Sequence, residues 1–156
     1  MIERTRFFRR VVYGPAPDSC HLWVGALGDD GYGRFWISRG GHQIVVRPHR
    51  YALALELDRA LEENEVAMHR RCDNPLCVNT GTGDPFLAHV VLATSSESMS
   101  DMGRKGRGGG RRWRFGADRA ERARRSRAVR EAVLKHGWSQ QAIEAALYEE
   151  TQGTLW

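Results

Sequence analysis

The 156-residue chain has no long apolar run, few cysteines and few lysines. No segment approaches the roughly 20 consecutive apolar residues that a bilayer span requires, so we expect neither a membrane segment nor a membrane partner. The N-terminus places arginines around Phe7 and Phe8 and lacks the apolar core of a secretory signal peptide. We therefore expect the protein to work in the cytoplasm.

Three cysteines, Cys20, Cys72 and Cys77, form an odd set in a chain with no export signal. This pattern argues against a disulfide framework and makes metal ligation the competing interpretation. Cys72 and Cys77 bound a proline turn as a C-x4-C pair, and His89 follows further along the chain. Together with Cys20 they offer four soft ligands, as a closed zinc site needs; three small buried thiols are the alternative.

Arginine supplies nearly all the positive charge, because only Lys105 and Lys135 among the 24 basic residues are lysines. The planar guanidinium forms forked hydrogen bonds with phosphate, although a GC-rich genome gives the same bias. Residues 1–100 carry 11 basic and 12 acidic side chains, whereas residues 101–156 carry 13 and 7. The C-terminal third is therefore expected to contact a polyanion, DNA in preference to RNA, or to be a solvated tail.

Glycine and proline divide the chain into predicted elements. Aromatic and β-branched residues at 20–24 and 34–37, on either side of a glycine-rich loop, predict a hairpin. Further strands are predicted at 43–47 and 89–93, and the leucine spacing between residues 51 and 61 predicts a helix.

The C-terminal half is predicted to be helical. Thr94 and Glu97 match the capping box, which predicts a helix over 95–106. The same pattern at residue 118 predicts a helix over 118–135, and Ser139 is expected to cap a third helix.

Several motifs stand in a fixed order along the chain. They are Cys20-x2-Trp23-x-Gly25, Gly31-Tyr32-Gly33-Arg34-Phe35, His49-Arg50, His69-x2-Cys72-Asp73-Asn74-Pro75-x-Cys77, His89-x2-Leu92 and Asp101-Met102-x2-Lys105-Gly106-Arg107. In this order they resemble the HNH, or His-Me finger, endonucleases. The resemblance is to the zinc-containing proteins of phages and mobile elements, including the His-Cys box homing endonucleases.

The resemblance implies an α+β fold, in which a ββα-metal (His-Me finger) core with a structural zinc is followed by a C-terminal helical pair. We expect a nuclease-like domain over 1–102, a basic Gly/Arg-rich linker over 103–117 and a helical DNA-binding appendage over 118–156. The zinc ligands that the resemblance implies are Cys20, Cys72, Cys77 and His89.

The family's catalytic histidine lies on the first strand of the core and activates water beside one divalent ion, Mg2+ or Mn2+. The matching position is His69. A neutral imidazole can accept a proton at physiological pH, and the ion stabilises charge on the phosphate. An arginine near the His49-Arg50 motif contacts the scissile phosphate in relatives, and we choose Arg50 over Arg47; a surface ion pair is the alternative.

Two departures from the family pattern concern the catalytic metal. Ser98 stands where relatives offer asparagine or histidine, and Met68 stands where many have an aspartate before the catalytic histidine. Asp101, one turn beyond Ser98, offers a carboxylate to the same region. The spacing from His69 to Cys72 is one residue longer than the common form, so we expect a bulge beside His69.

The predicted function is therefore a metal-dependent DNA endonuclease or nickase of homing or phage type. The alternative is a DNA-binding or regulatory protein that keeps the fold and has lost cleavage, and assembly as a homodimer stays open. The residues expected to bind DNA are Arg104, Lys105, Arg107, Arg111, Arg112, Arg114, Arg122 and Arg125.

Overall fold

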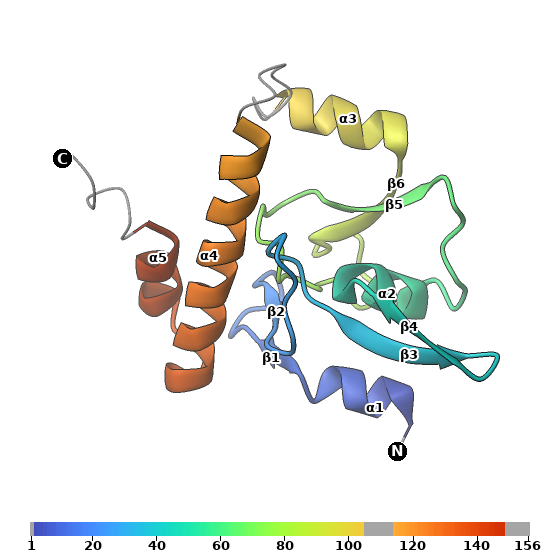
Figure 1. Cartoon of the computed structure of the whole chain (residues 1–156), viewed down its shortest axis with the longest axis horizontal. Helices are drawn as coiled ribbons and strands as arrows, with labels where there is room; N and C mark the ends of the chain where they lie inside the picture. The colour runs from blue at the N-terminus through green and yellow to red at the C-terminus, as the bar shows by residue number, and fades with distance from the viewer. Residues whose placement is uncertain (1, 105–113, 149–156) are drawn as a thin grey trace.

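The computed structural model describes residues 2–104 and 114–148 (Figure 1). The elements are α1 (Glu3–Phe8), β1 (Val11–Tyr13), β2 (His21–Trp23), β3 (Phe35–Arg39), β4 (His42–Val46), α2 (Pro48–Glu56), β5 (Glu65–His69), β6 (Val90–Thr94), α3 (Ser95–Arg104), α4 (Arg114–His136) and α5 (Gln140–Tyr148). Within this part of the chain, no helix is long and apolar enough to cross a membrane. Residues 105–113, most of the predicted linker, lie outside the described residues.

The fold combines these helices with small antiparallel sheets of two strands each: β1–β2, β3–β4 and β5–β6. The predicted hairpin between 20–24 and 34–37 is wrong, because β2 pairs with β1 and β3 pairs with β4. Gly40 and Gly41 explain the difference. Both have positive φ (58° and 79°) and form a two-residue turn, which closes β3 onto β4 over a much shorter loop.

Helix α2 confirms the predicted helix but begins and ends earlier, at Pro48 and Glu56. Proline suits the first helical position because its φ is already helical and it has no N–H to leave unbonded. The helix stops because Asp58, just beyond the cap residue Leu57, adopts a left-handed φ of 52°. The early start makes His49 part of the first turn.

Strands β5 and β6 form a regular antiparallel pair, and α3 follows β6 directly and packs against both strands. The capping box is confirmed. The amide of Glu97 donates to Oγ1 of Thr94 (3.2 Å), and the amide of Thr94 donates to Oε2 of Glu97 (2.7 Å). The bulge expected beside His69 is absent, since His69 pairs in register with Val90 and the extra residue falls in the turn that follows.

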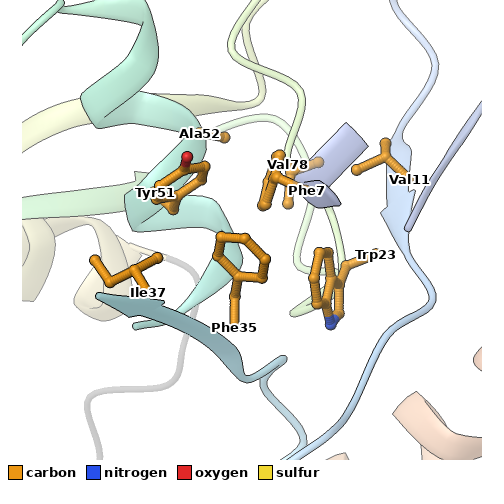
Figure 2. Close-up of a cluster of buried hydrophobic side chains, with 8 residues drawn as sticks. All are labelled: Phe7, Val11, Trp23, Phe35, Ile37, Tyr51, Ala52 and Val78. Carbon is orange, nitrogen blue, oxygen red and sulfur yellow. The ribbon is translucent and has the colours of Figure 1, made fainter. Parts of the chain in front are cut away.

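An aromatic cluster joins α1, β2, β3 and α2 (Figure 2). Phe7 is fully buried, and its ring centroid lies 5.3 Å from Trp23, 5.3 Å from Phe35 and 4.7 Å from Tyr51. The hydroxyl of Tyr51 donates to Glu3 (2.9 Å). This packing fixes α2, the helix that carries His49 and Arg50, against the strands.

The C-terminal helices share a second apolar cluster with the N-terminal strands. Val129 and Val133 of α4 and Ile143 of α5 are buried with Leu22 and Val24. Figure 1 shows α4 between α5 and the β1–β2 sheet. These helices are therefore packed on the rest of the protein through their apolar face.

The helix boundaries at this end follow local rules. Helix α4 begins at Arg114, earlier than the predicted start at residue 118. The predicted cap of the third helix is confirmed, because Oγ of Ser139 accepts a hydrogen bond from the amide of Ala142 (3.2 Å). Gly137 makes the turn between the helices with a φ of 71°.

Candidate metal centre and the neighbouring histidines

The four predicted soft ligands converge at one point of the fold. One ligand atom from each of Cys20, Cys72, Cys77 and His89 lies within 4.8 Å of the others. Nδ1 of His89 is 3.4 Å from Sγ of Cys20 and 3.6 Å from Sγ of Cys77. The two nitrogen–sulfur distances fit a zinc tetrahedron, whose N···S edge is about 3.5 Å for Zn–S and Zn–N bonds of about 2.3 and 2.0 Å. The cluster can therefore hold a metal ion such as zinc.

His89 is held in the tautomer that a metal ligand needs. The residue is buried, and its Nε2 lies 2.6 Å from the carbonyl oxygen of Asp18. Because a carbonyl only accepts hydrogen bonds, Nε2 carries the proton and Nδ1 presents its lone pair to the cysteines. In metal sites such an outer hydrogen bond orients the ring and raises its basicity as a ligand.

The arrangement of the three thiols favours the thiolate form of Cys72 and the neutral form of the other two. Hydrogen bonds from Cys20 and Cys77 lower the pKa of Cys72. The hydrogen bond to Cys72 raises the pKa of Cys20, and burial, followed by hydrogen bonding with Cys20 and Cys72, raises the pKa of Cys77. Zinc takes cysteine as thiolate, so loading the site would release protons from the thiols.

Asn79 connects the loops that carry the ligands, and it is fully buried. Its Nδ2 donates to the carbonyl oxygen of Ser19 (2.7 Å), next to Cys20. Its backbone carbonyl oxygen accepts from the amide of His89 (2.9 Å). Asn79 stands two residues after Cys77 in the sequence, but its connecting role becomes visible only in the structure.

His69 ends β5 beside this cluster. Its Nε2 lies 3.0 Å from the carbonyl oxygen of Cys77. The carbonyl can only accept, so Nε2 carries the proton and Nδ1 is the basic nitrogen of the neutral ring. The orientation of His69 therefore depends on the same backbone that supplies the Cys77 ligand.

A second histidine, His49, packs on His69 with ring centroids 4.9 Å apart. Tyr32 contacts both rings, at 5.4 Å from His49 and 6.5 Å from His69. His49 is 4% exposed, and its Nδ1 has no hydrogen-bond partner among the described residues. Burial, followed by the proximity of His69, holds the pKa of His49 well below its usual range, so the ring is neutral.

Arg50 and Arg47, the two candidates for phosphate binding, have different partners. Nη1 of Arg50 donates to the carbonyl oxygen of Glu65 (2.9 Å), at the end of β5 away from the metal cluster. Arg47 pairs with Asp30 (2.9 Å), and its guanidinium lies 4.4 Å from the ring centroid of Tyr32. The structure therefore brings Arg47 to the Tyr32 side of the histidine pair, whereas Arg50 is bonded to the backbone of β5.

Ser98 and Asp101 are the half-buried residues of α3, and the rest of that helix is exposed. They lie one turn apart, on the face that packs against β5 and β6. Among the described residues, Asp101 does not belong to a close group of three or more histidine, cysteine or acidic side chains.

The expected DNA-binding residues divide into three groups. Arg104 ends α3 and is exposed, whereas Arg122 and Arg125 of α4 have protein partners. Nε of Arg122 donates to the carbonyl oxygen of Asp30 (2.7 Å), and Arg125 pairs with Glu121 (2.8 Å). The residues that lie outside the described part, by position or by side chain, are Lys105, Arg107, Arg111, Arg112 and Arg114.

The loop around Asp30 receives arginines from several elements. The buried Asp30 carboxylate pairs with Arg34 (3.0 Å) and Arg47 (2.9 Å). Burial opposes its ionisation, but hydrogen bonds from Arg34 and the Tyr32 amide and the charges of both arginines outweigh burial and lower the pKa of Asp30. From α4, Arg119 pairs with the neighbouring Asp29 (2.9 Å).

Comparison with known proteins gives one distant relative. No protein-family model and no solved structure matches the chain. The chain is similar to Protein 7.7 of Escherichia phage T7, with 33% identity over 90 residues, which is 58% of this chain. The matched region spans 59% of the phage protein.

Proposed function

We propose that the protein is a metal-dependent DNA endonuclease of the HNH (His-Me finger) type, encoded by a phage or mobile element and acting in the cytoplasm of the host cell. The observation that carries the proposal is the hydrogen bond from Nε2 of His69 to the carbonyl oxygen of Cys77. It leaves Nδ1 as the basic nitrogen at the end of the first strand of a strand–strand–helix unit.

In this proposal Cys20, Cys72, Cys77 and His89 bind a structural zinc ion. The donor set of three sulfurs and one nitrogen fits zinc in a closed tetrahedral site. A zinc ion held there would fix the Cys77 backbone, whose carbonyl oxygen orients His69 as the general base that takes a proton from the attacking water.

The same proposal assigns the catalytic Mg2+ or Mn2+ to the inner face of α3. The oxygens of Ser98 and Asp101 are hard ligands that suit these ions, which usually keep several waters and need few protein ligands. When bound, such an ion stabilises the negative charge that develops on the phosphate and the leaving oxygen.

A second candidate function is DNA binding without cleavage. Met68 cannot serve a hard cation as a carboxylate would, and Ser98 is a weak neutral ligand. A chain with these two residues and a basic C-terminal third would still bind DNA after losing the cleavage activity.

Nicking of supercoiled plasmid in the presence of Mg2+ or Mn2+ distinguishes the two functions. The nuclease proposal expects nicks from the parent protein, none from His69→Ala, and parental nicking from His42→Ala, whose histidine is exposed on β4. The absence of nicks with diverse DNA supports the binding protein, and equal nicking by His69→Ala rejects His69 as the base.

A further inference from the structure

The ring of Tyr32 is a meeting point of two distant parts of the chain. Arg47, just before α2, lies 4.4 Å from its centroid, and Arg122 of α4 lies 5.3 Å from it. The same ring contacts His49 and stacks at 6.5 Å on His69. The ring of Tyr32 therefore lies between these two guanidinium groups and His69, the proposed catalytic histidine.

The charges around this ring do not cancel. Four guanidinium groups contact the loop of residues 29–32, which offers two carboxylates. The contributing side chains are Arg34, Arg47, Arg119 and Arg122. An excess of two positive charges beside a proposed phosphodiester site favours an anionic partner.

The exposure of Arg47 shows that this surface can be reached from solvent. Its side chain is 45% exposed, although one terminal nitrogen donates to Asp30. A guanidinium carries five N–H donors, so an ion pair through one nitrogen leaves others able to meet a phosphate. Asp30 and Tyr32 hold the group in place, which reduces the entropy cost of binding.

The backbone of α4 is seated directly on this loop. Gly31 has a φ of 82°, and a Cβ built there would lie 2.8 Å from the carbonyl carbon of Arg122. The close approach fixes the start of the Arg122 side chain relative to Tyr32. The two arginines therefore lie on one continuous surface around Tyr32.

We propose that Arg47 and Arg122 bind the phosphodiester backbone of duplex DNA on either side of the Tyr32 contact, so that the strand passes from α4 toward His69. The inference rests on the proposed function in taking DNA as the partner. It adds a path for the DNA, and it gives phosphate binding to Arg47 in place of Arg50.

The test is the salt dependence of binding to a short mixed-sequence duplex, measured by fluorescence anisotropy without added Mg2+. Removing one arginine–phosphate interaction should reduce the slope of log K against log salt by about 0.9. We expect this reduction for Arg47→Gln and again for Arg122→Gln. Arg47→Lys, which keeps the charge, should keep nearly the parental slope.

Arg59→Gln is the matched control. Arg59 is 44% exposed and pairs with Glu65 at 2.7 Å, so it resembles Arg47 in exposure and in having a carboxylate partner. Its substitution should leave the slope unchanged. Thermal unfolding of each variant identifies any that fail to fold. If Arg47→Gln fails to fold, Arg122→Gln, which changes a different element, tests the proposal on its own.

The outcomes separate this surface from the nuclease proposal. If the Arg47 and Arg122 variants have reduced slopes and the parent protein cuts no DNA, the DNA-binding surface is supported and the nuclease proposal is rejected. Equal slopes for the Arg47, Arg122 and Arg59 variants overturn the surface, even if plasmid is nicked. A parent protein that does not bind the duplex overturns it as well.

Discussion

At the scale of single residues, the ion pairs of Asp30 show how arginine side chains connect separate segments of this small protein. Its carboxylate is buried and accepts from Arg34 and Arg47. Hydrogen bonds between charged groups contribute about 1.5–3 kcal/mol each when one partner is buried. Asp30 thus connects the loop after β2 to the start of α2, and holds Arg47 over Tyr32.

Asp30→Asn should lower the free energy of unfolding by about 2 kcal/mol at pH 7, as expected for removing charged hydrogen bonds. The folded-state pKa of Asp30 lies below its unfolded value, so its contribution is complete above the unfolded pKa of about 3.9 and is lost as the pH falls through the folded pKa. Urea unfolding of parent and variant at several pH values should therefore give curves that converge at acid pH.

Asp29→Asn is the control for this measurement. Asp29 is 79% exposed in its pair with Arg119, so its removal should cost less than about 1 kcal/mol. A gap between parent and Asp30→Asn that stays constant down to about pH 2 would contradict the role given to the ionised carboxylate.

The residue types of the C-x4-C turn indicate metal binding or small buried thiols, and the resemblance to zinc-containing HNH proteins selects the four ligands. Cys20, Cys72, Cys77 and His89 meet as expected. The contact between Tyr32, His49 and His69 is not predictable in this way. It depends on how α2 packs beside β5, and no local sequence pattern encodes that packing.

At the scale of elements, the seat of α4 on the loop at Gly31 decides where the basic helix lies. A Cβ at Gly31 would meet the α4 backbone at 2.8 Å, and the φ of 82° is strained for any other residue. Among the α4 residues whose side chains the structure describes, the buried ones are Ala123, Ser126, Val129 and Val133. The lack of a side chain at position 31 therefore allows the α4 backbone to approach this loop closely.

Gly31→Ala should destabilise the protein by more than Gly40→Ala does. Gly40 also has a positive φ, 58°, but a Cβ there would have nothing within 4 Å. The Gly40 variant should cost about 1–2 kcal/mol from backbone strain alone. Chemical denaturation measures both, and equal costs would show that α4 is not seated on Gly31.

The sequence predicts helix ends correctly where a side chain hydrogen-bonds to a nearby backbone amide. It does not predict which strands pair with each other. The Thr94–Glu97 box and the Ser139 cap are both present. The predicted partner of the strand after residue 20 is wrong. Pairing is decided by tertiary contacts and by the Gly40-Gly41 turn, which closes β3 onto its immediate neighbour in sequence.

At the scale of the whole molecule, the cysteine cluster connects the N-terminal loop, the C-x4-C turn and the start of β6. The amide of Trp23 donates to the carbonyl oxygen of Leu76 (2.8 Å), and the amide of Val78 donates to the carbonyl oxygen of His21 (2.8 Å). Strand β2 is therefore also hydrogen-bonded to this turn. Structural zinc contributes roughly 10–16 kcal/mol of binding free energy in small zinc domains. The fold should therefore depend on the metal.

Zinc removal with a strong chelator should lower the thermal unfolding temperature substantially, and added zinc should restore it. His89→Ala should lower the zinc content below one ion per chain and reproduce the destabilisation. His21→Ala, which replaces a half-buried histidine packed on Tyr13, should keep the zinc. An unchanged unfolding temperature after complete zinc removal would reject a structural role for the site.

We propose that a zinc-held backbone orients His69 as the base that activates water for DNA cleavage. The most direct measurement is the single-turnover cleavage rate of parent and His69→Ala, with Mg2+ saturating and the zinc content of both preparations determined. General base catalysis contributes about 100-fold or more, so the rate should fall by at least that factor while both proteins hold one zinc ion. Equal rates in the two zinc-loaded proteins would show that His69 is not the base.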